Sequence, residues 1–363
     1  MKFPALAYIT WAKSLPRVEV NLARSGVALC PPSVLGLTAS DLVATLPVKH
    51  GYTPLRDAIA ARYDARPSQV FGISGGASYA NWLACITALD GCTQGTEVIV
   101  ERPTYEPLLQ IPRTLGYRVR RLDRRFEDGY AVDLDRFASL VTNKTRLAVI
   151  SNLHNPSGAR VPMATLRAMA SMLARVKAHL LVDEVYLECL FRSRPESCVH
   201  AGPNVLTTNS LTKAYGLDGV RAGWILGPPG LIARAQRIND LVTNNSVAAG
   251  ERMALAAFRR LRDLDRRAHA ILDPNLAQLR TYFGREPRLR AVIPEGGNVV
   301  FPRLPSAIDS DRLVRHLVKN ASTLVVPGRF FEAPRHIRLS FGCSASLLGR
   351  GLLNLSRALD DLS

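Results

Sequence analysis

Short apolar runs alternate with amphipathic helical stretches from about residue 51 to residue 227. Runs rich in β-branched and aliphatic residues predict strands at 97–101, 146–152, 179–184, 205–210 and 221–227. Apolar residues at helical spacing predict helices at 53–63, 78–89, 134–140 and 162–176. Strands that are apolar on both faces and separated by helices indicate a mostly parallel sheet covered on both sides. In such sheets the ligand binds beyond the carboxyl ends of the strands.

The pattern changes after residue 227. A long helical stretch runs to about residue 284, and apolar runs at 292–304, 323–328 and 336–342 predict a small sheet with flanking helices. The first 40 or so residues show no strong period. We therefore expect an α/β fold in three parts. These are an N-terminal arm that joins the small domain (1–45), a large domain (46–255) and a smaller α+β domain (256–363).

Composition is ordinary for a soluble globular chain of 363 residues, with 47% hydrophobic and 21% charged residues. Pro4 and Lys13 interrupt the apolar start, so a secretory signal is not expected, and no apolar run approaches the roughly 20 residues of a membrane helix. The six cysteines form no CxxC pair, which argues against a zinc site and a disulfide framework. We expect no metal site and a reducing cytoplasm.

The formal net charge of +17 has two explanations. A nucleic acid or another anionic partner would be attracted by such a charge. Alternatively, the charge reflects a preference for arginine and lies on a solvated surface. Basic residues cluster at 118–126 and 251–269, and in the second stretch acidic residues are interleaved at helical spacing. This interleaving favours the surface explanation, so a nucleic-acid partner is not expected.

Only seven of the 47 basic residues are lysines. One of them, Lys213, lies in "TTNSLTKAYGLDGVRAGWILG" among small and apolar residues rather than on a charged face. A lysine can lose its proton and act as a nucleophile, whereas a guanidinium cannot. On its own the lysine is better explained as the cap of a turn after a strand.

Several further motifs accompany this lysine. The stretch around it reads S-x-x-K-x-x-G-x-x-G-x-R-x-G, and it is preceded along the chain by "SGGASYANWLA", "RPTYEP", "HNPSG" and "LVDEVY" and followed by "HIRLSF". In this order the motifs resemble those of the fold-type I pyridoxal-phosphate enzymes of the class I/II aminotransferase group, over nearly the whole chain. The resemblance implies that the large domain binds pyridoxal 5′-phosphate.

The resemblance makes Lys213 the Schiff-base lysine and the proton shuttle of the reaction. Such a lysine needs a desolvated pocket near cationic groups, which lowers its pKa. Ser210 and Arg221 would bind the cofactor phosphate, Arg221 through paired charge-assisted hydrogen bonds. The backbone amides of Ala77 and Ser78, at the start of a helix, would bind the same phosphate.

The other motifs imply contacts to the ring of the cofactor. Asp183 would pair with the pyridine nitrogen and keep the ring cationic, so that it accepts electrons. Tyr186 and Asn155 would hydrogen-bond its phenolic oxygen, and Asn155 also borders the substrate. Tyr105 would stack on the ring, with a core tyrosine as the alternative.

Two residues are implied in substrate binding. Arg338 matches the arginine that binds the substrate α-carboxylate. Because it alternates with Ile337 and Leu339, it lies on the opposite strand face, either in solvent or in the cleft. Its planar guanidinium group can donate two parallel hydrogen bonds to a carboxylate, which favours a position in the cleft. Gly26, in the N-terminal segment, would add a backbone contact.

The sequence departs from the family pattern at two places. Many relatives place a tyrosine five residues before the glycine of "GYTPLR", where it reaches the phosphate of the neighbouring subunit; here that position is Leu46. Relatives specific for dicarboxylates use an arginine about one helix after the lysine, where this chain reads "LVTNNSVAAG", with Asn244 and Asn245. Recognition of aspartate or glutamate is therefore not expected.

The leading hypothesis is an aminotransferase that moves the amino group of an amino acid to a 2-oxo acid. A carbon–sulfur β-lyase, or another α-carbon elimination enzyme of the same fold, is the alternative, since both begin with proton abstraction by Lys213. A regulator without catalysis is the third possibility, opposed by the retained site residues. The apolar and irregular N-terminal segment, together with the family pattern, predicts a homodimer with active sites at the subunit boundary.

Overall fold

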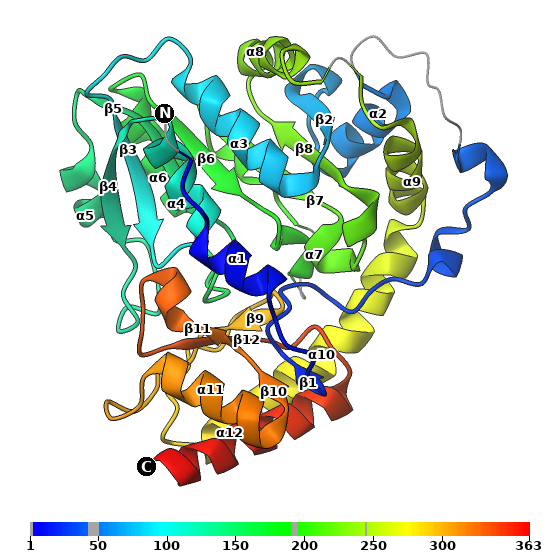
Figure 1. The fold of residues 1–363 in the computed structure, drawn as a ribbon. Helices are drawn as coiled ribbons and strands as arrows, with labels where there is room; N and C mark the ends of the chain where they lie inside the picture. Colours follow the sequence, from blue (N-terminus) through cyan, green and yellow to red (C-terminus); the bar gives the residue numbers. More distant parts are fainter. Residues whose placement is uncertain (1–2, 43–50, 191–194, 244) are drawn as a thin grey trace.

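The computed structural model describes residues 3–42, 51–190, 195–243 and 245–363 and is shown in Figure 1. A large α/β part carries the main sheet, and a smaller part lies below it in this view, with α12 (Ala345–Leu362) at its outer edge. The structure also contains the helices α2 (Thr53–Arg62), α9 (Ala248–Arg259) and α10 (Leu261–Arg285).

The main sheet has seven strands in the order β2-β8-β7-β6-β5-β3-β4. The strands are β2 (Val70–Ser74), β3 (Glu97–Arg102), β4 (Arg118–Asp123), β5 (Thr145–Ser151), β6 (His179–Asp183), β7 (Val205–Ser210) and β8 (Ala222–Leu226). Only β8 runs antiparallel to its neighbours β2 and β7. The expected fold class, a mostly parallel sheet flanked by helices, is confirmed.

Helices cover both faces of this sheet (Figure 1). Val98 and Val100 of β3 belong to the same hydrophobic cluster as residues of α3 (Gly76–Leu89), α4 (Glu106–Thr114) and α8 (Pro229–Asp240). Ile99 between them belongs to the cluster on the other face, with residues of α5 (Leu134–Leu140) and α6 (Met163–Ala174). This alternation explains why the central strands are apolar at successive positions.

The smaller part contains two short sheets. One is antiparallel with the order β11 (Val326–Pro327), β12 (Ile337–Ser340) and β9 (Val299–Val300). In the other, β1 (Val20–Asn21) pairs in parallel with β10 (Thr323–Leu324). Helices α11 (Ser310–Ala321) and α12 cover these strands. The pairing of β1 with β10 supports the proposal that residues 1–45 belong with 256–363, and the three-part division remains a proposal.

Several elements differ from the sequence predictions. Strand β4 was not expected because its alternating arginines resemble a charged surface; it is an edge strand that pairs only with β3. Strand β2 was also not predicted from the sequence; it is short, contains Gly72 and lies at the other edge of the sheet. Helix α1 (Ala7–Lys13) was missed because the first 40 residues show no strong hydrophobic period.

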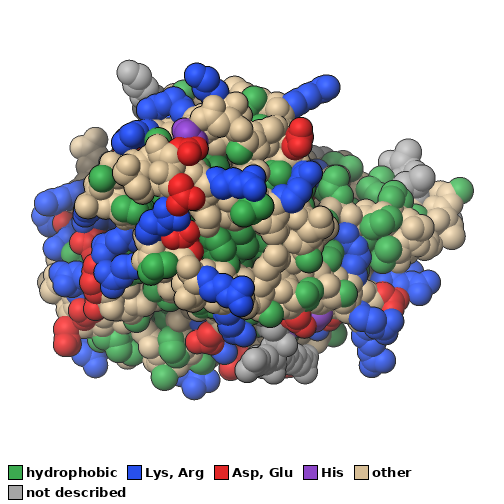
Figure 2. All heavy atoms as spheres, turned by 90° about the horizontal axis from the view of Figure 1, so that it is seen from below, with side chains coloured by type: hydrophobic (Ala, Val, Ile, Leu, Met, Phe, Trp, Pro, Cys, Tyr) green, Lys and Arg blue, Asp and Glu red, His purple; other side chains and the backbone are tan. Residues whose placement is uncertain are grey.

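Basic and acidic side chains are mixed on one face of the molecule (Figure 2). On the face of the smaller part shown in Figure 2, basic side chains are spread widely and acidic ones lie between them. Among the described residues, no helix is long and apolar enough to cross a membrane.

The N-terminal segment is fixed closely against the helix that carries Lys213, α7 (Thr212–Tyr215). Gly216 ends this helix with φ 67°, and a Cβ added there would lie 2.3 Å from the carbonyl oxygen of Ala28. A side chain at this position would therefore both strain the backbone and push the segment away.

We predict that Gly216→Ala lowers the free energy of unfolding by about 1–3 kcal/mol, as measured by urea denaturation. The matched control is Gly219→Ala in the same loop, where an added Cβ meets no atom within 4 Å, and this variant should unfold like the wild type. Equal losses in the two variants would contradict the close packing as the cause.

Candidate active site

A pocket of about 230 Å³ lies at the carboxyl ends of the parallel strands. Asp183 and Ser210 are the last residues of β6 and β7, and Asn155 follows β5. Eight of the residues singled out in the sequence line this pocket: Ala77, Ser78, Tyr105, Asn155, Asp183, Ser210, Lys213 and Arg221. The fold therefore brings together groups separated by more than 140 positions.

The three remaining residues lie directly behind the pocket wall. Arg338 is 1% exposed and donates to Asn155 Oδ1 at 3.0 Å. Tyr186 is also 1% exposed, and its hydroxyl makes no hydrogen bond of standard geometry with the described residues. Gly26 packs against the backbone of Lys213, since an added Cβ would lie 3.6 Å from that carbonyl oxygen.

Lys213 lies on the floor of this pocket, on α7. Burial and, to a smaller extent, the cationic Arg338 lower the pKa of its amine to about 8, against the opposing effect of Asp183. At pH 7 roughly a tenth of the amine is then neutral, against less than a thousandth for an exposed lysine. The pocket thus holds an amine that can act as a nucleophile near neutral pH.

Asp183 is the anionic end of the pocket. Burial raises the pKa of its carboxyl, whereas the backbone N–H of Val185 and the amide of Asn81 favour the ionised form. The two donors lie at 3.0 Å and 2.8 Å. Thr208 donates to the amide oxygen of Asn81, which fixes the amide with its nitrogen toward Asp183. A buried carboxylate held this way suits a cationic ring nitrogen.

The opposite end of the pocket suits a phosphate. Helix α3, 14 residues long, begins here and presents the backbone amides of its first turn, near Ala77 and Ser78. The Arg221 guanidinium lies beside this turn and donates to the carbonyl oxygen of Gly75 at 2.6 Å. A Cβ at Gly76 would lie 3.1 Å from that guanidinium, so the absence of a side chain at Gly76 leaves room for Arg221 beside the start of the helix.

Arg338 is held at the substrate side of the pocket. Besides Asn155, it donates to the hydroxyl of Tyr8 at 2.8 Å, and its guanidinium lies 4.9 Å from the ring centre of Phe331. Tyr8 belongs to α1, whose Ile9 and Ala12 also line the pocket. The arginine is therefore buried beside the pocket rather than exposed to solvent.

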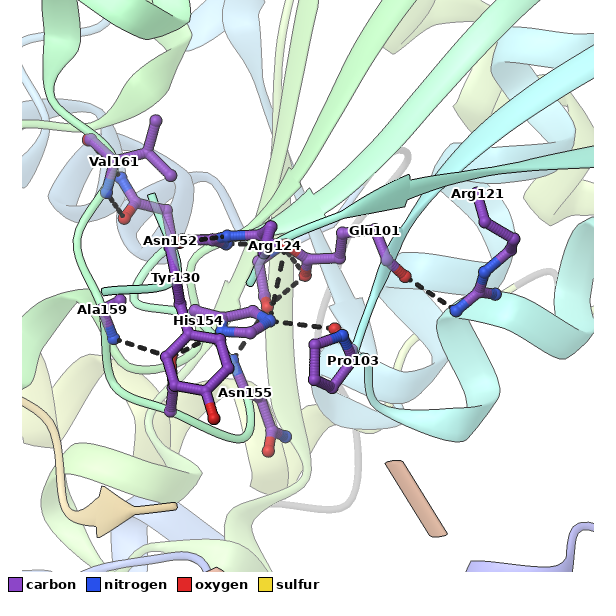
Figure 3. Close-up of polar contacts among 12 residues, drawn as sticks. Glu101, Pro103, Arg121, Arg124, Tyr130, Asn152, His154, Asn155, Ala159 and Val161 are labelled. Atoms are coloured by element: carbon purple, nitrogen blue, oxygen red, sulfur yellow. Dashed lines mark hydrogen bonds and ion pairs between the residues drawn. The ribbon is translucent and has the colours of Figure 1, made fainter. Parts of the chain in front are cut away.

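A buried polar network supports Asn155 from behind, as Figure 3 shows. The carboxylate of Glu101 pairs with Arg124 at 2.7 Å, and both side chains are fully buried. Its other oxygen accepts from the Ser151 hydroxyl at 2.6 Å, and that hydroxyl accepts from the backbone N–H of Asn155 at 2.9 Å. This chain of bonds fixes the backbone that carries Asn155.

His154 completes the turn beside this network (Figure 3). Its Nε2 lies 2.9 Å from the carbonyl oxygen of Pro103, and its Nδ1 lies 2.6 Å from the hydroxyl of Ser157. Burial, reinforced by Arg124, holds the pKa of His154 well below its ordinary value. The imidazole is therefore neutral, and it has a structural place in the turn.

The pocket residues that were not predicted from the sequence include Tyr8, Ser25 and Asn81. Asn81 lies three positions after Ser78 on α3 and so on the same helix face, which is a usable signal. Ser25 adjoins Gly26, whereas nothing in the sequence marks Tyr8. Leu46 and Asn244 lie outside the described residues. Within the described ranges no group of acidic, histidine or cysteine side chains could hold a metal ion.

The features expected for pyridoxal phosphate are thus present together. A reactive amine lies between a buried carboxylate and a helix start with an adjacent guanidinium. The Tyr186 hydroxyl and the amide nitrogen of Asn155, whose oxygen is already bound by Arg338, are available as donors. These groups fit the ring and phosphate of that cofactor.

Comparison with known proteins gives a consistent result. The model of the family described as aminotransferase class I and II matches residues 32–353. Capreomycidine synthase from Streptomyces vinaceus is 32% identical over 318 residues, covering 84% of this chain and 78% of the relative. Aspartate/prephenate aminotransferase from Thermus thermophilus is 30% identical over 284 residues, covering 73% of this chain and 70% of the relative.

Solved structures share the fold. A PLP-dependent aminotransferase from Streptococcus suis superposes with a TM-score of 0.92 at 24% identity, covering 100% of this chain and 99% of that one. The PLP-dependent cyclase OrfR superposes with a TM-score of 0.88 at 28% identity, covering 100% and 98%. The chain belongs to the aminotransferase class I and II family and is a pyridoxal-phosphate-dependent enzyme of the transaminase type.

Proposed function

We propose that amino-group transfer takes place in this pocket with Lys213 as the residue that captures the cofactor. The observation that carries the proposal is a partly buried amine with a pKa of about 8, hydrogen-bonded inside a pocket lined by Asp183 and Arg221. Pyridoxal phosphate, when bound, supplies an aldehyde for this amine and a ring that takes up electrons from the substrate. Nζ of Lys213 also removes and returns the proton of the substrate α-carbon.

The surrounding side chains have separate tasks in this proposal. Asp183 keeps a proton on the ring nitrogen, which its buried position makes effective. Asn155 and Tyr186 donate to the phenolic oxygen, and Tyr105 covers the ring. The amides of Ala77 and Ser78, together with Ser210 and Arg221, bind the phosphate.

Arg338 is the proposed anchor of the substrate α-carboxylate, with Gly26 beside it. A substrate side chain near this anchor meets Ile9 and Ala12 of α1 and Val185, which line the same pocket. Among the described lining residues, the only cations are Lys213 and Arg221, which have other roles. We therefore propose donors with uncharged, mainly apolar side chains and a 2-oxo acid as acceptor.

A second candidate function is elimination or replacement at the substrate side chain, including cleavage of a carbon–sulfur bond at the β-carbon as in a β-lyase. One observation favours it: a 32% identical relative is a synthase, and a structural neighbour at 28% identity is a cyclase. Both functions share the proton removal by Lys213, so the pocket supports either.

We also propose that the enzyme is a homodimer with each site at the subunit boundary. Three apolar side chains beside the phosphate end are exposed, Leu241 by 88%, Val242 by 58% and Val247 by 60%. The backbone N–H of Val247 donates to Ser74 Oγ at 2.9 Å, which fixes this apolar patch next to the start of α3. A second copy covering the patch would remove it from water. The cytoplasm remains the proposed location, supported by six unpaired cysteines.

We predict that single amino acids, supplied with a 2-oxo acid, will be used at least about tenfold better when their side chains are uncharged than when they are charged. Formation of the new amino acid is the measurement. Preferential use of aspartate, glutamate, lysine or arginine would contradict the proposed donor class. Release of pyruvate and ammonia without an acceptor would establish lyase chemistry instead.

We predict that the protein sediments as a dimer at micromolar concentration. The double variant Leu241→Lys with Val247→Lys should shift it toward monomer, because two buried charges oppose the interface. Leu353→Lys is the control, since Leu353 is 52% exposed on α12, a different surface. A wild-type monomer that turns over substrate would contradict the shared site.

A further inference from the structure

The amine of Lys213 has one hydrogen-bond partner among the described residues. Its Nζ lies 2.8 Å from the hydroxyl oxygen of Ser25, which also lines the pocket. Ser25 belongs to the N-terminal segment, far from Lys213 in the chain and directly before Gly26. A reactive amine and a hydroxyl at this distance form a pair whose geometry can control the reaction.

The backbone around Ser25 is fixed on the side of α7. The N–H of Val27 donates to the carbonyl oxygen of Lys213 at 2.8 Å, and the N–H of Cys30 donates to that of Gly216 at 3.0 Å. Because Gly216 has no side chain, the backbone of Ala28 can approach it closely enough for this contact. The segment that carries Ser25 therefore keeps a fixed register against the lysine.

The same segment is fixed on the side of β12. The N–H of Ser340 donates to the carbonyl oxygen of Leu22 at 2.8 Å, and the N–H of Ala28 donates to that of Gly342 at 2.6 Å. A Cβ at Gly342 would lie 2.7 Å from the carbonyl oxygen of Gly26, so the two backbones touch. Ser25 thus lies on a backbone held from two sides, as a preorganised catalytic group requires.

We propose that Ser25 is a catalytic residue of the amino-group transfer. Its hydroxyl accepts an N–H of Lys213 and so aims the nitrogen lone pair while Nζ removes the proton from the substrate α-carbon. Ser25 also lowers the pKa of the neighbouring Tyr186 hydroxyl, against the larger effect of burial. The inference rests on the proposed role of Lys213, and it adds a second group at the reacting nitrogen.

This role predicts two effects with opposite signs. The hydroxyl binds the ammonium form more strongly than the neutral amine, so its removal lowers the pKa of Lys213 further. Reaction of the amine with reagents therefore becomes easier at neutral pH. Proton removal from the substrate becomes slower, because the lone pair is no longer aimed. A loss of structure would impair both.

The test compares Ser25→Ala with the wild type in two measurements. In the full-length protein without cofactor, the pH midpoint for labelling Lys213 with an amine-directed reagent, read by peptide mass spectrometry, should fall by about one unit or somewhat less. In the holoenzyme, kcat should fall about tenfold or more, with a larger kinetic isotope effect for α-deuterated donor.

Two controls accompany the alanine variant. Ser25→Thr keeps a hydroxyl and should stay close to the wild type in both measurements. Ser33→Ala removes an exposed hydroxyl from the same segment, outside the pocket, and should change neither. A labelling midpoint that rises or does not move, or an unchanged isotope effect, would overturn the role of Ser25.

The role of Lys213 is tested separately. Borohydride reduction of the holoenzyme should attach the cofactor to Lys213 in the wild type and in Ser25→Ala alike. A tag on another lysine would overturn the proposed function itself. Tagging at Lys213 together with an unchanged isotope effect would overturn only the inference about Ser25.

Discussion

The burial of one amine is the constraint on which the rest of this structure depends. An ammonium group removed from water loses solvation, and here that loss lowers the pKa of Lys213 to about 8. The amine is stabilised in its pocket because Ser25 accepts a hydrogen bond from it at 2.8 Å and Asp183 supplies a negative charge. The same burial strengthens every charge interaction in the pocket, so the polar groups around it must be held in place.

The sheet supplies that support. The ends of β6 and β7 and the turn after β5 bring Asp183, Ser210 and Asn155 to one edge. Behind them, the buried pair of Glu101 and Arg124 is linked through Ser151 to the backbone of Asn155 (Figure 3). Such a pair is costly to bury and more costly to break, and it keeps the turn in one arrangement. Asn155 can therefore hold Arg338 while its amide nitrogen stays available.

Much of this fold was accessible from the sequence because central strands and their helices follow strong periods. The strand predicted at 205–210 matches β7, and the helix predicted at 134–140 matches α5. Local motifs also led to Lys213, Asp183 and Arg221, because their order and spacing along the chain resemble those of a known family. Tyr8 and Ser25 escaped because their contacts are made by a segment without periodicity, whose position depends on tertiary contacts with α7 and β12. Edge strand β4 escaped because its solvent side carries arginines.

The central claim is that burial makes the Lys213 amine reactive near neutral pH. The most direct measurement is the rate at which cofactor-free protein captures pyridoxal phosphate between about pH 6 and about pH 11, quantified at Lys213 after borohydride reduction. A base with a lowered pKa is neutral above that pKa, so the rate should rise to a plateau with a midpoint near the pKa of about 8. A midpoint near that of an exposed lysine, about 10.4, or capture at a different lysine would contradict the account.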